Sequence, residues 1–540
     1  MKAPFAITLD VGSSLLNKTG SWRSQRPLYV DRLPPCNHAC PAGENIQQWL
    51  YLAEEGRYEE AWRQIMDDNP FPAVMGRVCY HPCESACNRG HLDEAVGINA
   101  IERFLCDQAI KHEWQMNPGK PTGKRVMIVG AGPGGLAAAY HLRRLGHHVT
   151  IYDASPQAGG MLRYGIPSYR LPREKLNAEI ARIKEMGVDI QLNSRIDDIP
   201  AAKNEGKFNA VFLALGAQLP KRVEIPVKGK VAMLDAVTVL RNMELEEPTG
   251  LRGRIVVYGG GNTAMDVART AIRLGARDVS VVTIEAEEQM PAHIFEVNEA
   301  REEGATLICL RSIREVRGNE VILEKMVPGE GRWPQPTGQF ENIEADIVVQ
   351  ALGQNVETVL MDGVSGIKVV EGTVHVGADM HTGARDIFAG GDMIPSQRTV
   401  TTSIGHGKKA ARHIDAVLRG AAYAPADKHE VVTFDMLNTW YYSDAPRTVR
   451  PMLSVIRRQS GFAEIIGDID RENATFEARR CMSCGNCFEC DNCYGVCPDN
   501  AIRKLGPGNR FEFKYDYCKG CGICPSECPC GAIMMMPEEI

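Results

Sequence analysis

The sequence predicts an α/β multidomain protein with a cysteine-rich domain near each end. From Arg125 onward, seven apolar runs alternate with helical stretches, which is typical of parallel α/β units. The runs are RVMIVGAG, HVTIYDA, AVFLALGA, RIVVYGGG, VSVVTIEA, DIVVQALG and DIFAGGD. Two of them open glycine-rich turns. A chain of 540 residues also exceeds one ordinary core, because about 150 residues per domain favours three or four domains.

The bulk composition argues against several classes of protein. No stretch approaches the ~18 apolar residues of a membrane span, and the first residues lack the apolar core of a signal peptide. A net charge of -7 without a long basic run argues against a nucleic-acid partner. We therefore expect a cytoplasmic protein with neither a membrane nor a nucleic-acid partner. In that compartment, cysteines two residues apart indicate metal binding rather than disulfides.

The chain begins with a segment of no strong periodic pattern over residues 1–35, which we expect to be an extended arm. Helical stretches follow, one from Asn45 to Met66 and one through Leu105. Five cysteines lie between these features: Cys36, Cys40, Cys79, Cys83 and Cys87. This region is therefore expected to be a helical metal-binding domain.

The first glycine-rich turn predicts a dinucleotide site. It contains Gly130, Gly132 and Gly135, between the strand RVMIVG and the helix LAAAYHLRRLG. Small residues let the backbone reach a pyrophosphate, and the helix N-terminus supplies donors and a positive dipole. Asp153 ends the second strand, where an acid meets ribose hydroxyls. The alternative is a turn that only packs a helix against a strand.

The second glycine-rich turn has the same context, between the strand RIVVYG and the helix MDVARTAIRLG. Its residues are Gly259, Gly261, Asn262, Thr263 and Ala264, and its second strand leads to Glu285. Two such sites in one chain indicate a flavin nucleotide and a nicotinamide nucleotide, between which a hydride passes. We expect no catalytic acid or base, because hydride transfer needs none.

The last 60 residues hold 11 of the 18 cysteines, in a pattern typical of paired [4Fe-4S] clusters. Two runs are spaced C-x2-C-x2-C-x3-C-P, and in such pairs the fourth cysteine ligates the other run's cluster. One predicted ligand set is Cys487, Cys490, Cys493 and Cys528, and the other is Cys518, Cys521, Cys524 and Cys497. A disulfide scaffold or zinc ribbons would need a different compartment or spacing. The region is predicted to be a bacterial ferredoxin-like α+β domain.

Taken together, five motifs resemble the small subunit of bacterial glutamate synthase and its relatives. These relatives include the electron-entry half of dihydropyrimidine dehydrogenase and the large subunit of NADH-dependent ferredoxin:NADP oxidoreductase. The motifs are CPAGENIQ with the three cysteines after it, the turn at Gly130, AGGMLRYGIPSYRLP, the turn at Gly259, and FAGGD followed by SIGHGKKAA. The resemblance covers roughly residues 36–420.

The resemblance implies two Rossmann-like domains, with FAD in the first and the NAD domain inserted into the FAD domain. It implies that Asp153 holds the FAD adenosine ribose. It also implies that Gly159, Gly160 and Met161 line the flavin, and that Gly391 and Asp392 bind the ribityl-phosphate region. Alternatively, Asp392 is an ordinary turn aspartate. The expected boundaries are 1–120 for the arm and helical iron-sulfur domain, 121–250 and 371–420 for the FAD domain, 251–370 for the NAD(P)H domain, 421–480 for a connector and 481–540 for the ferredoxin-like domain.

The same resemblance predicts the nicotinamide coenzyme. Family members that use NADPH carry paired arginines just after the second strand of this domain, whereas this chain has Glu285, Glu287 and Glu288 there. A carboxylate accepts hydrogen bonds from free ribose hydroxyls but repels a 2'-phosphate. We therefore expect NADH rather than NADPH, unless Glu285 is only a solvated surface charge.

The resemblance further implies two [4Fe-4S] clusters in the N-terminal domain. One uses positions matching Cys40, Cys79, Cys83 and Glu102. The other uses positions matching Cys36 and Cys87 together with an upstream C-x2-C pair, which this chain lacks. We expect Cys481 and Cys484, in the context EARRCMSCG, to replace that pair.

The five N-terminal cysteines, Cys481 and Cys484, the eight cysteines of the two regular runs and Glu102 then make 16 ligands, enough for four clusters. The alternative is one N-terminal cluster built from four of the five cysteines there, which gives three clusters in all. Glu102 has two alternatives of its own. It is either a helix-surface carboxylate, or it is replaced as a ligand by Cys106, one helical turn away.

We therefore expect an NADH:acceptor oxidoreductase subunit with FAD and several [4Fe-4S] clusters. In a hetero-oligomer it would exchange electrons with another redox enzyme subunit or a ferredoxin, in a direction that the sequence leaves open. Its partner would be an enzyme such as a 2-oxoacid:ferredoxin oxidoreductase or a sulfite reductase. The alternatives are a glutamate synthase small subunit that supplies electrons from NADPH, and a non-enzymatic redox-sensing interaction protein.

Overall fold

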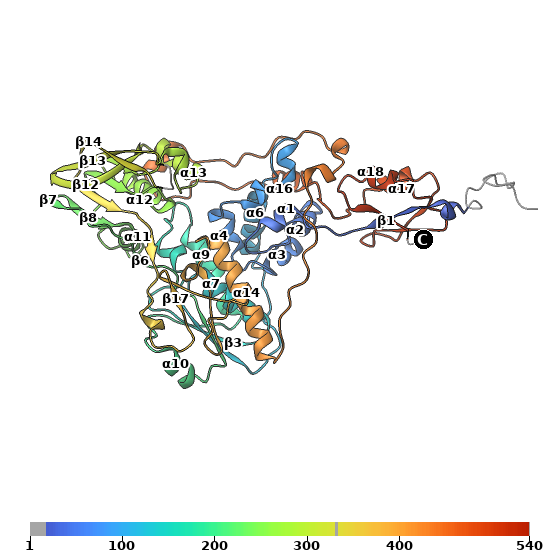
Figure 1. Ribbon diagram of the computed structural model, residues 1–540, viewed down its shortest axis with the longest axis horizontal. Coiled ribbons are helices and arrows are strands. Elements are labelled where there is room, and N and C mark those ends of the chain that lie inside the picture. Colours follow the sequence, from blue (N-terminus) through green and yellow to red (C-terminus); the bar gives the residue numbers. More distant parts are fainter. Residues whose placement is uncertain (1–17, 330–332, 539–540) are drawn as a thin grey trace, which may run out of the picture.

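The computed structural model describes residues 18–329 and 333–538. Figure 1 shows an elongated molecule with the dinucleotide-binding units at one end and the ferredoxin-like domain at the other. The helical domain lies between them. None of the helices within the described ranges has the length and apolar composition that a membrane span requires.

The helical domain is built from short helices around buried tryptophans. Its helices are α1 (Pro35–Ala39), α2 (Ile46–Glu54), α3 (Tyr58–Met66), α4 (Pro72–Val78), α5 (Pro82–Ser85) and α6 (Ile98–Lys111). Proline begins α1, α4 and α5, where its missing N–H costs no helical hydrogen bond. Trp49 and Trp62 are fully buried. Gly76 lets α4 approach α6 closely, because a Cβ there would lie 2.6 Å from the Cβ of Arg103.

The first dinucleotide-binding unit is a five-stranded parallel sheet in the order β19-β5-β2-β3-β4. Its strands are β2 (Arg125–Val129), β3 (His148–Tyr152), β4 (Asp189–Gln191), β5 (Ala210–Leu213) and β19 (Ile387–Ala389). The helices α7 (Pro133–Arg144), α9 (Arg173–Glu185) and α14 (Val400–Leu418) belong to the same unit, and α14 packs on α7. Buried apolar strands explain the continuous apolar runs of the sequence.

The second unit is inserted between β5 and β19. Its parallel sheet has the order β11-β10-β9-β15-β8. The elements are β8 (Ala232–Asp235), α11 (Ala236–Glu244), β9 (Arg254–Tyr258), α12 (Asn262–Arg273), β10 (Asp278–Val282), α13 (Ile294–Glu302), β11 (Thr306–Ile308) and β15 (Ile347–Gln350). This sheet begins with β8, which lies before the expected boundary at residue 251. No signal in the sequence marks β8, because it is a short edge strand without an apolar run.

A second sheet in this unit has no counterpart among the apolar runs. Its order is β14-β13-β12-β7, and three of its strands pair as an antiparallel meander. The strands are β7 (Val227–Gly229), β12 (Arg311–Gly318), β13 (Glu320–Val327) and β14 (Gln335–Glu344). Exposed residues along β14 explain the missing apolar signal.

The ferredoxin-like domain takes one of its strands from the other end of the chain. It contains α17 (Asn492–Val496), β20 (Ile502–Lys504), β21 (Phe511–Phe513), α18 (Ile523–Ser526) and β22 (Ile533–Pro537). β1 (Gln25–Tyr29) pairs antiparallel with β22, and Tyr29 lies opposite Ile533. The expected arm therefore contains a strand of the ferredoxin-like domain, while residues 1–17 of that arm lie outside the described part of the chain.

The expected connector, residues 421–480, is largely irregular but carries two helices, α15 (Val455–Gln459) and α16 (Arg471–Arg479). α16 packs against α2 and α6 of the helical domain. Arg458 of α15 pairs with Glu302 of α13 at 2.9 Å. The connector thus joins the inserted unit to the helical domain before it enters the ferredoxin-like domain.

Candidate functional site

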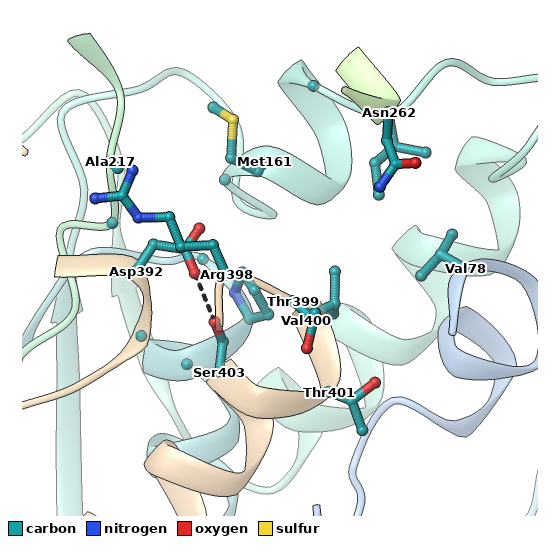
Figure 2. Close-up of a pocket in the computed structure, with 18 of the residues that line it drawn as sticks. Val78, Met161, Ala217, Asn262, Asp392, Arg398, Thr399, Val400, Thr401 and Ser403 are labelled. Carbon is teal, nitrogen blue, oxygen red and sulfur yellow. Dashed lines mark hydrogen bonds between the residues drawn. The ribbon is translucent and has the colours of Figure 1, made fainter. Parts of the chain in front are cut away.

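A cavity of about 640 Å³ lies where the two dinucleotide-binding units meet the helical domain. Figure 2 shows Asp392 and Ser403 on one side, with Met161 and Asn262 across the cavity. The predicted residues that line it are Gly130, Gly132, Asp153, Gly160, Met161, Gly391, Asp392, Asn262 and Thr263. The remaining predicted nucleotide residues, Gly135, Gly159, Gly259, Gly261, Ala264 and Glu285, are not among its lining. Both predicted nucleotide sites therefore open into one space.

The glycines of the first turn serve two different purposes. Gly130 has φ +109°, and a Cβ there would lie 2.3 Å from the carbonyl oxygen of Ala214. A Cβ at Gly135 would lie 1.9 Å from the oxygen of Gly130. At Gly132 a Cβ would meet only the Cα of Gly160, at 3.9 Å. The first two glycines are thus required by packing, whereas Gly132 leaves backbone open to the cavity.

Asp153 and the glycine pair at 159–160 lie beside this turn. The Asp153 carboxylate accepts hydrogen bonds from the amide nitrogens of Ala131 and Ser155, both at 2.7 Å, and lines the cavity. Gly159 and Gly160 have φ of +129° and +52°, which other residues adopt at a cost. Gly160 brings its backbone against Gly132 in the turn. Gly160 therefore forms part of the cavity wall, and Gly159 lies directly behind it.

Asp392 points into the cavity from the loop after β19. Its carboxylate accepts a hydrogen bond of 3.2 Å from Ser403 Oγ on α14 (Figure 2). Burial raises the pKa of Asp392, and the Ser403 hydrogen bond counters that shift. A buried carboxylate with one side-chain partner favours a further hydrogen-bond donor from a ligand. This placement differs from that of an ordinary turn aspartate, which caps its own turn.

In the second turn, as in the first, one glycine is required by packing and another leaves its backbone open. Gly259 has φ +141°, and a Cβ there would lie 2.4 Å from the oxygen of Ala351. A Cβ at Gly261 would meet no atom within 4 Å. Asn262 begins α12, and its Oδ1 accepts a hydrogen bond of 2.8 Å from the amide of His293. Gly261 is therefore free of packing demands and adjoins the start of a helix, as a pyrophosphate site requires.

Glu285 lies against this turn. Its Oε2 accepts a hydrogen bond from Thr283 Oγ1, and the same oxygen lies 3.0 Å from where a Cβ of Gly260 would be. Glu287, two residues on, pairs with Arg301 at 2.5 Å. Glu285 is thus held beside the glycine-rich backbone rather than projecting freely into solvent.

Four thiols of what we call the second group come together between the connector and the helical domain. They are Cys36, Cys87, Cys481 and Cys484. Burial raises the pKa of Cys36, and the charges of Cys481, Cys87 and Cys484 raise it further. Cys481 therefore lies near Cys36 although it stands 445 residues later in the chain, counting from 36 to 481.

Buried polar contacts hold this pair in place. Glu477 is fully buried and accepts a hydrogen bond of 2.8 Å from the amide of Gly97. Arg480 donates to Glu477 at 3.0 Å and to the carbonyl oxygen of Glu94 at 2.6 Å. Asn88 Nδ2 lies 3.6 Å from Cys484 Sγ. These contacts fix the segment just before Cys481 on the helical domain.

The first group consists of Cys40, Cys79, Cys83 and Glu102, next to the cavity. Burial raises the pKa of Cys83, followed by the charges of Cys79, Glu84 and Cys40. Burial also raises the pKa of Cys79 to about 12, with Glu102 as the next cause. The four predicted side chains therefore converge.

Glu102 is buried, with 6% of its surface exposed, so it is not a helix-surface carboxylate. Burial raises its pKa, and the charges of Glu44 and Glu179 add to the shift, while Asn69 donates to its Oε1 at 3.1 Å. The pKa of Cys106 is raised by burial and then by Glu102 and Glu179, rather than chiefly by cysteines. Glu102 is among the charges that act on Cys79 and Cys40, whereas Cys106 is not, which favours Glu102 as the fourth member.

The cysteines of the ferredoxin-like domain interleave into a third and a fourth group. The third group is Cys487, Cys490, Cys493 and Cys528, and the fourth is Cys518, Cys521, Cys524 and Cys497. Burial raises the pKa of Cys493 to about 11, and the charges of Cys487, Cys490 and Cys528 contribute. A small cavity in this domain is lined by all four members of the fourth group. Cys528 thus lies near the first three cysteines of the other run, and Cys497 lies with those of the second run, while the exchange of ligands stays a prediction.

These donor sets fit iron-sulfur clusters. Clustered thiols that repel one another as thiolates suit a cationic core that takes up their charge. Within the described ranges, no three His, Cys, Asp or Glu side chains are arranged to hold a single metal ion. A cubane binds its four ligands through four different iron atoms, so its ligands are spaced more widely than those of one ion. The assignment of individual ligands stays a prediction.

Sequence reasoning missed several residues at these sites. Tyr80, between two cysteines of the first group, stacks on His293 of the inserted unit at 3.9 Å between ring centroids. Thr401 Oγ1 lies 3.4 Å from Cys79 Sγ, and the Tyr29 hydroxyl lies 3.2 Å from Cys493 Sγ. No local motif marks these contacts, because each joins residues from distant parts of the chain.

Comparison with known proteins identifies the family of the chain. The model described as "Pyridine nucleotide-disulphide oxidoreductase" matches residues 124–411. The model described as "Dihydropyrimidine dehydrogenase domain II, 4Fe-4S cluster" matches residues 16–114. The two matches correspond to the dinucleotide-binding units and to the helical domain with its arm.

Three curated relatives span most of the chain. The beta subunit of NADP(+)-dependent formate dehydrogenase from Moorella thermoacetica is 35% identical, over 83% of this chain and 70% of that protein. The beta subunit of NADPH-Fe(3+) oxidoreductase from Geobacter sulfurreducens is 34% identical, over 84% and 76%. The small chain of glutamate synthase [NADPH] from Escherichia coli K12 is 33% identical, over 70% and 87%. The resemblance to the glutamate synthase small subunit is thereby confirmed, and the chain belongs to the pyridine nucleotide-disulphide oxidoreductase family as an oxidoreductase with an N-terminal 4Fe-4S domain.

Proposed function

We propose that this chain is an NADH:acceptor oxidoreductase subunit that holds FAD and four [4Fe-4S] clusters. It passes electrons between NAD(H) at the cavity and a partner redox enzyme or ferredoxin at the ferredoxin-like domain. A bound flavin supplies the conversion between hydride transfer and single-electron transfer. The chain's own residues position the two nucleotides and the cluster ligands.

One observation carries this proposal: the four groups form an unbroken series that starts at the cavity. Thr401 lines the cavity and contacts Cys79 of the first group. Cys36, in the second group, contributes to the raised pKa of Cys83 in the first. Neighbouring groups of this series are thus close enough for their charges to interact.

The series continues into the ferredoxin-like domain through Tyr442 and Cys530. Burial raises the pKa of Tyr442, and the charges of Cys530, Cys484, Cys481 and Cys490 raise it further, so this ring lies between the second and third groups. The fourth group follows the third, since Cys493 is among the charges that raise the pKa of Cys524. A series of this kind suits stepwise electron transfer through the helical domain, which lies between the dinucleotide-binding units and the ferredoxin-like domain (Figure 1).

In the proposed nucleotide sites, Gly132 and Gly160 give the FAD pyrophosphate access to the backbone. Asp153 accepts from the adenosine ribose, and Asp392 accepts from the ribityl region. On the nicotinamide side, Gly261 with Asn262 and Thr263 of α12 holds the coenzyme pyrophosphate.

The proposed partner is another subunit of a hetero-oligomer. The printed names of the relatives describe subunits or a small chain of larger enzymes. An enzyme such as a 2-oxoacid:ferredoxin oxidoreductase or a sulfite reductase would exchange electrons with the ferredoxin-like domain. The glutamate synthase alternative gains less support, because the match to the Escherichia coli small chain covers 70% of this chain.

The anaerobically reconstituted full chain should contain about 16 iron atoms and one FAD, and should reduce a one-electron dye with NADH. About 12 iron atoms would reject the four-cluster arrangement in favour of three clusters. Full iron and flavin content without NADH-dependent dye reduction would instead support the redox-sensing alternative.

NADH is the proposed coenzyme, because the fixed carboxylate of Glu285 would repel a 2'-phosphate beside the turn. The wild-type chain should prefer NADH by at least about tenfold in kcat/KM, or ~1.4 kcal/mol. Glu285→Gln keeps the shape of the side chain and removes its charge, so the preference for NADH over NADPH should decrease. Glu320→Gln, at the exposed start of β13, is the matched control and should leave the preference for NADH unchanged. A wild-type preference for NADPH would overturn the assignment.

A further inference from the structure

Thr401 lies between the cavity and the first group. It is the second residue of α14, it is 6% exposed, and it lines the cavity (Figure 2). Its Oγ1 lies 3.4 Å from the Sγ of Cys79 and 3.5 Å from the Sδ of Met75. One buried hydroxyl thus adjoins both the proposed flavin site and a proposed cluster ligand.

The position of Thr401 in the helix leaves its hydroxyl free to donate to sulfur. In a helix interior, a threonine hydroxyl commonly bonds the carbonyl one turn earlier, but Thr401 is in the first turn. Thr399 caps the helix by accepting from the amide of Thr402, and the hydroxyls of these two residues bond each other at 2.8 Å. Thr401 has no part in that cap.

Of the two sulfurs within reach, Cys79 is the stronger acceptor once it is a thiolate. A hydrogen bond to an ionised group is about twice as strong as a neutral one, and the thioether of Met75 is a weak acceptor. The amide of His81 also donates to Cys79 Sγ, at 3.4 Å. Cys79 therefore receives one main-chain and one side-chain donor.

Other groups receive comparable donors, but the fourth group differs. Asn88 lies near Cys484 in the second group, and Tyr29 near Cys493 in the third. Within residues 18–329 and 333–538, the donors to thiols of the fourth group are main-chain amides, that of Ala501 to Cys497 at 3.2 Å and that of Gly520 to Cys518. Side-chain donors thus mark the three groups nearest the nucleotide end.

We propose that Thr401 is a positioning residue that raises the reduction potential of the cluster held by the first group. A cluster gains negative charge on reduction, so a donor to its sulfur stabilises the reduced form more than the oxidised form. The hydroxyl of Thr401 thereby favours entry of single electrons into the cluster next to the cavity. This inference rests on the proposed function, because it requires a cluster at the first group.

The test is a redox titration of the reconstituted full chain, monitored by electron paramagnetic resonance. Thr401→Val keeps the shape and removes the donor, and Thr401→Ser keeps the donor. The valine variant should lower the midpoint potential of one cluster by up to ~59 mV, which is about a tenfold decrease in the equilibrium constant for its one-electron reduction. The other clusters should keep their potentials, and the serine variant should resemble wild type.

Two further variants keep the result interpretable. Thr402→Val, one residue along, removes a hydroxyl that faces the helix cap and should leave every potential unchanged. If the valine variant folds poorly, Thr401→Ala takes its place and should lower the midpoint potential of the same cluster. Unchanged potentials with full iron content would overturn the inference alone. Wild-type protein that lacks a cluster at the first group would overturn both the inference and the four-cluster function.

Discussion

Replacing Cys481 and Cys484 together by alanine is expected to lower the iron content from about 16 to about 12 atoms per chain and to stop electrons at the first cluster. The reason is positional, because the second group lies between the first and the third in the series. NADH should still bleach the flavin, while NADH-dependent reduction of the ferredoxin-like clusters should fail. Anaerobic absorption spectra, resonance spectra and iron analysis together measure both effects.

This result would not arise from detachment of the ferredoxin-like domain. Buried Glu477 and Arg480 anchor the preceding segment to the helical domain without using either cysteine. Limited proteolysis should therefore give the wild-type pattern. Cys309→Ser, which alters a thiol of the inserted unit outside the four groups, is the control for iron content. Unchanged iron in the double variant would show that the pair is not ligating and would favour three clusters.

The second large effect is expected from a matched pair of glycine variants, Gly132→Ala and Gly261→Ala. A Cβ meets only one atom, at 3.9 Å, in the first case and no atom within 4 Å in the second, so the folded chain has room for both. The added methyl would instead meet the pyrophosphate that we place there. We expect Gly132→Ala to weaken FAD binding by at least about tenfold, ~1.4 kcal/mol, and Gly261→Ala to weaken NADH binding by a similar factor.

Each variant is the control for the other, because the two nucleotides are measured separately. Flavin content reports the first site, and the concentration dependence of flavin bleaching by NADH reports the second. Gly135→Ala should behave differently and lose thermal stability, since its Cβ would lie 1.9 Å from the oxygen of Gly130. Unchanged NADH affinity in Gly261→Ala would contradict the proposed coenzyme site.

The sequence predicted the parts of the fold that carry a local signal. All seven apolar runs are parallel strands, because a strand buried on both faces must be continuously apolar. β4, β8 and β11 gave no such run, since they are short and partly exposed. The residues of β1 were expected only to be extended, because the partner that makes them a strand lies about 500 residues away.

The same division holds at the candidate sites. Ligand spacing separates the third group from the fourth in sequence, and the EARRCMSCG context marks Cys481 and Cys484 as unused by either. No spacing shows which group lies next to which, because that order depends on how the domains pack. Thr401 and Tyr29 escaped prediction for the same physical reason: each meets a sulfur that is distant in the sequence, 322 residues away for Thr401 and 464 for Tyr29.

The pairing of β1 with β22 also has a consequence for how the chain is made. A ribosome adds about 5–20 residues per second, so the ~400 residues between Cys87 and Cys481 take roughly 20–80 s to emerge. Throughout that interval, Cys36 and Cys87 lack the other half of their group, and β1 lacks its partner strand. With the proposed ligand set, assembly of a cluster at the second group would therefore follow translation of the tail.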